Sequence, residues 1–218
     1  MESWEEEGSV SGSGLGAGTD VELVRQAWRN EKAAPEILPF EEALVRRLRE
    51  QIQLQEERAE ELKSEGMEDV VVSLHHMDSD RALFLLKSYL RLRLHKIEKH
   101  LFFYSSHTHL FARLSPEEQL FCNSCVDIMT QHLKQSVLNK LPQHYQSVTR
   151  QSTSSEDDDM VDSPQLDTFV FCKTKTDVGA FQLDDTGEEI VDLVVDDLYV
   201  LRYKSIRGLV ESGQINLI

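Results

Sequence analysis

Residues 81–101 read RALFLLKSYLRLRLHKIEKHL. Large aliphatic residues recur in this stretch at steps of three and four, at Leu83, Leu86, Leu90, Leu94, Ile97 and Leu101. This period predicts a long α-helix with one continuous apolar face. Val70–Val72 precede it and are compatible either with a short strand or with the start of the same helix.

The same stretch is also the most basic part of the chain. Residues 81–99 contain one acid, Glu98, and six bases: Arg81, Lys87, Arg91, Arg93, Lys96 and Lys99. One interpretation is a basic stripe that meets an acidic partner or a phosphate backbone. The other, which we favour, is the solvated face of an amphipathic helix whose aliphatic stems cover neighbouring residues.

Two helices are predicted upstream of this stretch. In the first, Asp20 is the expected N-cap, and Pro35 and Pro39 end the segment. Its expected inner face consists of Val21, Val24 and Trp28. The second spans roughly Glu41–Ser64, with Gly66 as its stop. Its apolar side consists of Leu44, Leu48, Ile52, Ala59 and Leu62.

A fourth long helix is predicted after a loop at residues 102–114. Ser115 is a favourable N-cap, Pro116 suits the first helical position, and Glu118 completes a capping box. Leu141-Pro142 is the expected end of the helix. Its buried face is expected to consist of Val126, Met129, Leu133 and Val137.

The pattern changes after an acidic, serine-rich segment at residues 149–165, which we interpret as a flexible linker. Residues 166–218 alternate in hydrophobicity and predict a small β-rich domain. The expected strands are 168–172, 180–183, 190–194, 199–203 and 215–218, with a turn at 184–187 and a short helix at 205–212 whose inner residues are Ile206, Leu209 and Val210. The chain is therefore expected to be α+β, with an all-α domain of about four to five helices at 20–148 and the β-rich domain at 166–218.

Charge and composition narrow the functional classes. The net charge is −16, but most of the excess lies in the acidic tail 1–19, expected to be disordered, and in the linker. No part has the strongly basic balance of a stand-alone DNA-binding protein. We expect the acidic N-terminus to be no secretory signal, and the three cysteines are too few for a disulfide framework, which points to the cytosol or nucleus.

No motif predicts catalysis, a cofactor or a metal site. Cys122 and Cys125 form a CxxC pair, but they lie inside the predicted fourth helix and have no second pair, so we interpret them as helix-surface or seam residues. His75-His76 and His107-x-His109 lack metal-binding spacing. Because no nucleotide-binding glycine loop or GxSxG motif is present either, we expect no catalytic residues, no cofactor and no metal.

Three serines are candidate phosphorylation sites. Ser154 and Ser155 precede an acidic run, which acid-directed kinases prefer, and Ser163-Pro164 fits a proline-directed kinase. All three lie in the predicted linker, where modification is sterically easy.

Three stretches carry a resemblance to a known family. Residues 88–99, SYLRLRLHKIEK, resemble the core helix motif of the GINS complex, a four-subunit eukaryotic replication factor. Residues 27–38, AWRNEKAAPEIL, and 201–218, LRYKSIRGLVESGQINLI, resemble the first helix and the C-terminus of the SLD-five type of subunit. The PSF-one type has the same helical-then-β order and is the nearest alternative.

The resemblance implies a non-catalytic subunit of a heterotetramer with an A-type helical domain and a B-type β domain. The implied partners are the PSF-one, PSF-two and PSF-three types of subunit, the MCM helicase ring, the CDC-forty-five protein and other replisome factors, in the nucleus. The sequence has no clear import signal, so import together with partners is expected. No membrane partner is expected. Contact with DNA is expected to be weak or indirect.

Several large residues are expected to anchor the core or an interface: Trp28, Tyr89, Tyr203, Leu217 and Ile218. Arg91, Arg93 and Lys96 are expected to contact carboxylates, either within this chain or across an interface. The alternative function is a stand-alone single-stranded DNA-binding or adaptor module that uses the β domain, whose aromatic residues support it and whose negative charge opposes it.

Overall fold

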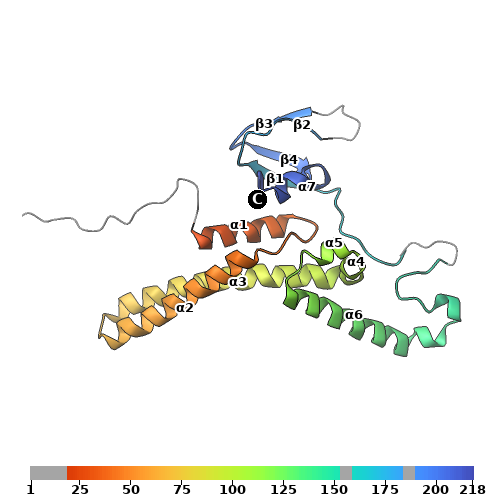
Figure 1. The fold of residues 1–218 in the computed structure, drawn as a ribbon, viewed down its shortest axis with the longest axis horizontal. Coiled ribbons are helices and arrows are strands. Elements are labelled where there is room, and N and C mark those ends of the chain that lie inside the picture. The colour runs from red at the N-terminus through yellow and green to blue at the C-terminus, as the bar shows by residue number, and fades with distance from the viewer. Residues whose placement is uncertain (1–18, 153–158, 184–189) are drawn as a thin grey trace, which may run out of the picture.

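The computed structural model describes residues 19–152, 159–183 and 190–218. Helices occupy the first part of the chain and a small sheet domain the last part, which confirms the α+β class (Figure 1). Residues 1–18 of the expected disordered tail, Ser154, Ser155, the acids Glu156–Asp158 and the turn at 184–187 fall outside the described residues. Within the described ranges, no helix is long and apolar enough to cross a membrane.

Helix α1 (Asp20–Ala33) is capped one residue earlier than expected. Thr19 is the N-cap, and Glu22 completes the capping box with it. Asp20 is instead the first helical residue, and its carboxylate accepts hydrogen bonds from Arg47 at 2.9 Å and from Gln51 at 3.0 Å. The prediction of Asp20 as the cap was wrong because Thr19 also favours this position, and Glu22 lies at the spacing that completes a capping box with Thr19 and not with Asp20.

Helices α2 (Glu42–Ser64) and α3 (Asp69–Lys99) form a long hairpin. Gly66, at φ 78°, makes the turn between them, as expected, and Val70–Val72 belong to the start of α3. The predicted inner face of α2 is buried throughout. Helix α1 lies across this hairpin and buries Val24 in a core shared with Leu48, Leu86 and other residues of α2 and α3 (Figure 1).

The segment 102–114 is not a simple loop. Helix α4 (Leu101–Ser106) and helix α5 (Thr108–Phe111) occupy most of it. Neither helix has a side-chain N-cap, and both are shorter than the length over which a helical period can be recognised, so the sequence did not reveal them. Tyr104 of α4 and Leu110 of α5 pack in a core with Ile37 and Cys122.

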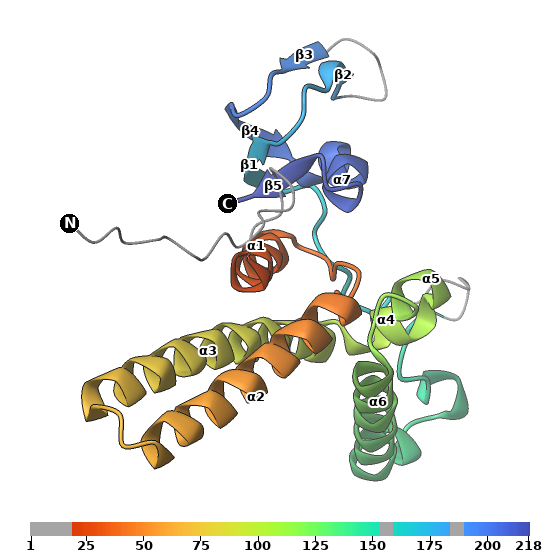
Figure 2. The same cartoon turned by 60° about the vertical axis from the view of Figure 1, so that its left-hand side comes forward.

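Helix α6 (Pro116–Ser136) begins with the predicted capping box of Ser115 and Glu118. It ends earlier than expected, and two short 3₁₀ helices, η1 (Leu138–Lys140) and η2 (Gln143–Tyr145), follow it. The predicted buried face was only partly right. Val126 and Leu133 are half-buried, but Met129 and Val137 are 45% and 50% exposed. The helix projects away from the α2–α3 hairpin, so only its beginning reaches the core of this chain (Figure 2).

The C-terminal part has a three-stranded antiparallel sheet in the order β4-β1-β5, formed by β1 (Phe169–Thr174), β4 (Leu198–Arg202) and β5 (Ile215–Leu217). A separate hairpin consists of β2 (Gly179–Gln182) and β3 (Ile190–Leu193). These positions follow the predicted strands closely. Helix α7 (Tyr203–Glu211) begins two residues before the predicted helix, so Tyr203 belongs to it and not to a strand.

The core of the small domain includes a residue from the helical part. Ile206 and Val210 of α7 pack with the inner residues of the sheet, as expected, and the half-buried Leu209 packs against the same cluster. Ala34, in the connection after α1, belongs to the same cluster. The two parts of the chain therefore share apolar packing.

The segment predicted as a linker makes contacts where the structure describes it. The Asp159 carboxylate accepts hydrogen bonds from the backbone N–H of Gln151 at 2.6 Å and of Ser152 at 3.0 Å. Nδ1 of His100 lies 3.1 Å from the carbonyl oxygen of Asp162. The contacts of Asp159 lie within the segment, whereas the contact of Asp162 with His100 ties the segment to the helical part.

Candidate functional site

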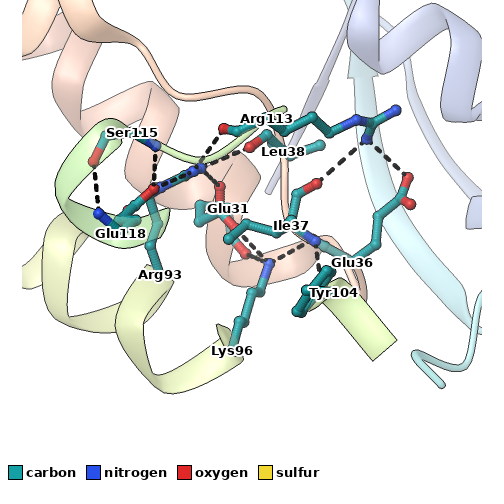
Figure 3. A network of polar contacts seen from close by, with 10 residues as sticks. All are labelled: Glu31, Glu36, Ile37, Leu38, Arg93, Lys96, Tyr104, Arg113, Ser115 and Glu118. Atoms are coloured by element: carbon teal, nitrogen blue, oxygen red, sulfur yellow. Dashed lines mark hydrogen bonds and ion pairs between the residues drawn. The ribbon is translucent and has the colours of Figure 1, made fainter. Parts of the chain in front are cut away.

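A buried arginine organises the centre of the molecule (Figure 3). The Arg93 side chain on α3 is fully enclosed, and its guanidinium lies over the Phe40 ring at 5.2 Å and the Tyr89 ring at 5.7 Å. Two parallel hydrogen bonds join it to Glu118, from Nε to Oε1 at 2.8 Å and from Nη2 to Oε2 at 3.0 Å. This is the bidentate arrangement that makes arginine–carboxylate pairs strong and directional.

The remaining donors of Arg93 are also used. Nη1 donates to Oε2 of Glu31 at 3.0 Å and to the carbonyl oxygen of Leu38 at 2.7 Å. Nη2 donates a second time, to the carbonyl oxygen of Arg113 at 3.2 Å. Since a guanidinium has five N–H groups, every donor has a partner. One side chain thus joins α1, the segment after it, α3, the segment before α6, and α6 itself.

Lys96 extends the network by one helical turn. Its Nζ donates to Oε1 of Glu31 at 2.8 Å, to the carbonyl oxygen of Glu36 at 2.8 Å and to the carbonyl oxygen of Glu31. Burial lowers the pKa of Lys96, and the neighbouring charge of Arg93 acts in the same direction, while Glu31 opposes both. For Arg93 the balance is reversed. Burial lowers its pKa, but the bond to Glu118 and the charge of Glu31 outweigh burial and raise it overall.

A second group of charges crosses from the helical part to the small domain. The Glu36 carboxylate lies 2.6 Å from Nε of Arg207 on α7 and 3.6 Å from Nη1 of Arg113, and it accepts a hydrogen bond from the Tyr203 hydroxyl at 3.0 Å. Arg113 also pairs with Glu211 of α7 at 2.6 Å. Burial, and then the Glu36 charge, raise the pKa of Tyr203.

The C-terminal strand makes a third connection. The backbone N–H of Leu217 donates to Oδ1 of Asn30 on α1 at 2.8 Å, and the Asn216 side chain accepts a hydrogen bond from Gln26. Leu217 itself is buried, whereas the terminal Ile218 side chain is 57% exposed. Of these two expected anchors, Leu217 therefore lies in the core, whereas the Ile218 side chain does not.

The structure separates the predicted anchors into groups. Tyr89 and Tyr203 are fully buried, and Trp28 is half-buried with Lys32 over its ring at 5.4 Å. Arg93 and Lys96 contact carboxylates within this chain, whereas Arg91 is exposed. Ser163 is exposed and thus accessible to a kinase.

The basic stretch on α3 does not form the uniform solvated face that we favoured. Arg81, Lys87, Arg91 and Lys99 are exposed, but Arg93 is enclosed and Lys96 is largely so. Arg93 lies four residues after Tyr89 and four before Ile97, on the buried face of the helix. This spacing was a usable signal in the sequence, although nothing there identified Glu31, Glu36, Arg113, Arg207 or Glu211 as partners.

This network resembles a structural clamp more than a reactive site. All donors of Arg93 are satisfied, and the carboxylates that face it are compensated. The described residues include no group of three or more His, Cys, Asp or Glu side chains placed to hold a metal. Burial raises the pKa of the Cys122 thiol and of the Cys172 thiol to about 11, so neither is a ready nucleophile at neutral pH.

Outside the network, large apolar side chains remain uncovered on three surfaces. The outer face of α3 exposes Val70, Leu74, Met77 and Phe84. Helix α6 exposes Leu120, Ile128 and Met129, and Val137, directly after the helix, is exposed as well. The outer face of the three-stranded sheet exposes Phe169, Phe171, Leu198 and Val200. Large apolar side chains left exposed in such numbers are typical of protein interfaces.

Comparisons with known proteins agree with both parts of the chain. A family model described as "GINS complex protein helical bundle domain" matches residues 45–137. A model described as "DNA replication complex GINS protein SLD5 C-terminus" matches residues 164–218.

Curated relatives match over nearly the whole chain, and each is named DNA replication complex GINS protein SLD5. The Arabidopsis thaliana protein is 50% identical over 213 residues, covering 97% of this chain and 96% of the relative. The Homo sapiens protein is 33% identical over 213 residues, covering 91% and 88%. The Dictyostelium discoideum protein is 30% identical over 206 residues, covering 91% of each. With its helical bundle, its small sheet domain and this similarity, the chain belongs to the SLD5 family of GINS complex subunits, which serve in DNA replication.

Proposed function

We propose that this chain is a non-catalytic scaffold of a GINS heterotetramer, together with subunits of the PSF-one, PSF-two and PSF-three types. The observation that carries the proposal is the uncovered apolar surface on α3, α6 and the sheet. On α6, Cys122, Val126, Met129 and Leu133 follow one another at steps of three and four, so one apolar face continues beyond the part that this chain covers.

The free energy gained by burying these side chains favours contact of these faces with a partner over exposure to solvent. Burying a large aliphatic or aromatic side chain contributes about 1.5–3 kcal/mol. Ile128 is 68% exposed, Phe84 67% and Phe171 65%, so most of this contribution is missing in the isolated chain. Sister subunits that cover these faces would supply it.

Co-expression of the full chain with the three other subunit types, followed by native mass spectrometry, tests the scaffold. The expected result is a particle with one copy of each. Met129→Glu on the apolar face of α6 is expected to prevent assembly while leaving the helical circular dichroism intact. Gln131→Glu, exposed on the same helix, is the matched control and leaves assembly unchanged.

Two results would contradict the scaffold. One is a full chain that stays a monomer with a sharp melting transition and does not enter a particle with the sister subunits. The other is equal assembly by the Met129→Glu and Gln131→Glu variants, because the apolar face of α6 would then have no role in association.

At the next level, we propose that the tetramer joins the MCM ring and the CDC-forty-five protein to form the replicative helicase in the nucleus. The family membership supports this role. A reconstituted tetramer is expected to co-purify with the MCM ring and the CDC-forty-five protein, and tagged chain is expected to concentrate in nuclei. A tetramer that associates with neither would refute the role in the helicase.

The alternative function, binding of single-stranded DNA by the β domain, has one supporting observation. Phe169 and Phe171 are exposed on the same sheet face, where Lys173 and Arg202 could contact a backbone. However, Lys173 pairs with Asp196 at 2.8 Å and Arg202 with Asp167 at 2.7 Å. This compensation favours a protein contact. Salt-dependent binding of an oligothymidine that Phe171→Ala abolishes would restore the alternative.

A further inference from the structure

Helix α1 covers only part of the apolar surface that α2 and α3 present to it. Beyond its first residues, a groove of about 800 Å³ continues along the hairpin. Its apolar lining includes Val21, Leu48, Ile52, Leu54, Ala82 and Leu85. The groove therefore continues the apolar core that already buries Val24 of α1 against Leu48, Ile52 and Ala82.

A buried hydroxyl at this groove has no hydrogen-bond partner. Ser79 lines the groove and is 4% exposed, and its Oγ is the only buried side-chain oxygen or nitrogen of the described residues without a partner. Native proteins satisfy nearly all such groups, so an unsatisfied one calls for a missing partner. A polar group of a bound segment would supply it after rotation of the Ser79 side chain.

The charges at the groove favour an acidic occupant. Its two carboxylates are already paired, Asp20 with Arg47 at 2.9 Å and Asp78 with Arg81 at 3.8 Å. Arg25 also lines the groove, and none of the described residues forms an ion pair with it. One cation is thus available at the edge of an apolar groove.

We propose that this groove binds the N-terminal segment of the same chain, residues 1–18, with Trp4 as the apolar anchor. The segment joins the folded part at Thr19, which itself lines the groove. It contains one aromatic residue, Trp4, followed directly by Glu5, Glu6 and Glu7. An indole covers an apolar floor and donates one N–H, which suits the Ser79 oxygen, and the glutamates suit Arg25.

The connection is long enough for this contact. Residues 8–18 are rich in Gly and Ser, and a chain of this composition between Trp4 and Thr19 spans on the order of 20 Å. The groove extends along α2 from Leu48 to Gln55, which is about 10 Å of helix. Such a tether holds Trp4 at an effective concentration of order millimolar, so even weak intrinsic affinity produces substantial occupancy.

A photo-crosslinking experiment identifies the occupant. Benzoylphenylalanine replaces Gln55, which is exposed and lines the groove, in the full chain, both alone and co-expressed with its sister subunits. The expected result is a crosslink from position 55 to a peptide within residues 1–18 of the same chain. Trp4→Ala is expected to lower its yield about tenfold, as for a binding contact of ordinary strength.

Two matched controls accompany this measurement. Val10→Ala in the same segment leaves the crosslink unchanged, because Val10 is not the anchor. The same photoprobe at Leu74, exposed on the outer face of α3 and absent from the groove lining, gives no crosslink to residues 1–18.

Three outcomes would overturn the proposal: no crosslink from position 55 to residues 1–18, a yield that Trp4→Ala does not change, or a crosslink to a sister subunit in its place. The last outcome would assign the groove to the assembly interface. Because the experiment is also done on the chain alone, failure to form a tetramer does not decide it.

Discussion

Removal of one carboxylate from the buried network is expected to destabilise the whole helical part. In the variant Glu118→Ala, Arg93 keeps its charge but loses two hydrogen bonds, of 2.8 and 3.0 Å, in a fully enclosed position. The Ser115 backbone N–H loses its 2.9 Å bond to the same carboxylate, so the cap of α6 is weakened as well.

The expected magnitude follows from these losses. Breaking a buried ion pair by removing one partner costs about 3–5 kcal/mol, because the other charge stays desolvated. We therefore expect a loss of about 4 kcal/mol in the free energy of unfolding, which for a chain of this size lowers Tm by about 8–16 °C. The neighbouring exposed residue provides the control, and Glu117→Ala is expected to change stability by less than about 0.5 kcal/mol.

Urea unfolding of the full chain, or thermal unfolding of the co-expressed assembly, measures these differences. A double-mutant cycle with Arg93→Met adds a second reading. When Met replaces Arg93, no buried positive charge is left unpaired, so the loss of Glu118 lowers the free energy of unfolding by less. The two changes are therefore expected to couple by about 2 kcal/mol. Equal stability of the Glu118→Ala and Glu117→Ala variants, or strict additivity with Arg93→Met, would refute the structural role of the pair.

Three further predictions concern buried groups. Burial raises the pKa of Tyr89 to about 12, so the folded chain holds the proton more tightly than the unfolded chain. The stabilisation from Tyr89 is therefore full below pH 10, and the free energy of unfolding falls by about 1.4 kcal/mol per pH unit between pH 10 and 12. In urea unfolding at a series of pH values, the free energy of unfolding of Tyr89→Phe is expected to fall less steeply in this range. Tyr203→Phe removes the 3.0 Å bond to Glu36 and is expected to cost about 1–3 kcal/mol in urea unfolding, whereas Tyr145→Phe, at an exposed tyrosine, costs almost nothing. At pH 8, mass spectrometry is expected to find Cys125 alkylated before Cys122 and Cys172, since these two are buried with a pKa raised to about 11, and equal rates in the folded chain would contradict their burial.

Local signals in the sequence were sufficient for most elements. The capping box of Ser115 and Glu118 places the start of α6, and Gly66 ends the α2 segment, because caps and positive-φ turns depend on a few adjacent residues. Apolar steps of three and four residues predict α2 and α3, and alternation predicts the strands of the small domain. Helices α4 and α5 were not predicted because they are too short to show a helical period.

The candidate site was only half accessible to such reasoning. The sequence pointed to Tyr89, Arg93 and Lys96 as residues that fix helices or contact carboxylates, since they fall within one strongly periodic helix. It did not identify Glu31, whose carboxylate accepts a hydrogen bond from Arg93 although the two residues lie 62 positions apart in the chain. A helical period relates neighbours within a helix and carries no information on which other helix lies opposite.

The sequence by itself thus determined the order of the elements, their periodic faces and the family resemblance, all of which depend on residues close together in the chain. Only the tertiary structure decided which charges are enclosed, that Tyr203 meets Glu36 across the two parts, and that the apolar face of α6 leaves the core after its first turns. The physical reason is that burial is a property of the packed assembly of elements. Arg91 and Arg93 lie on the same helix, yet Arg91 is exposed to solvent and Arg93 is enclosed and bonded to carboxylates, because different elements pack around each.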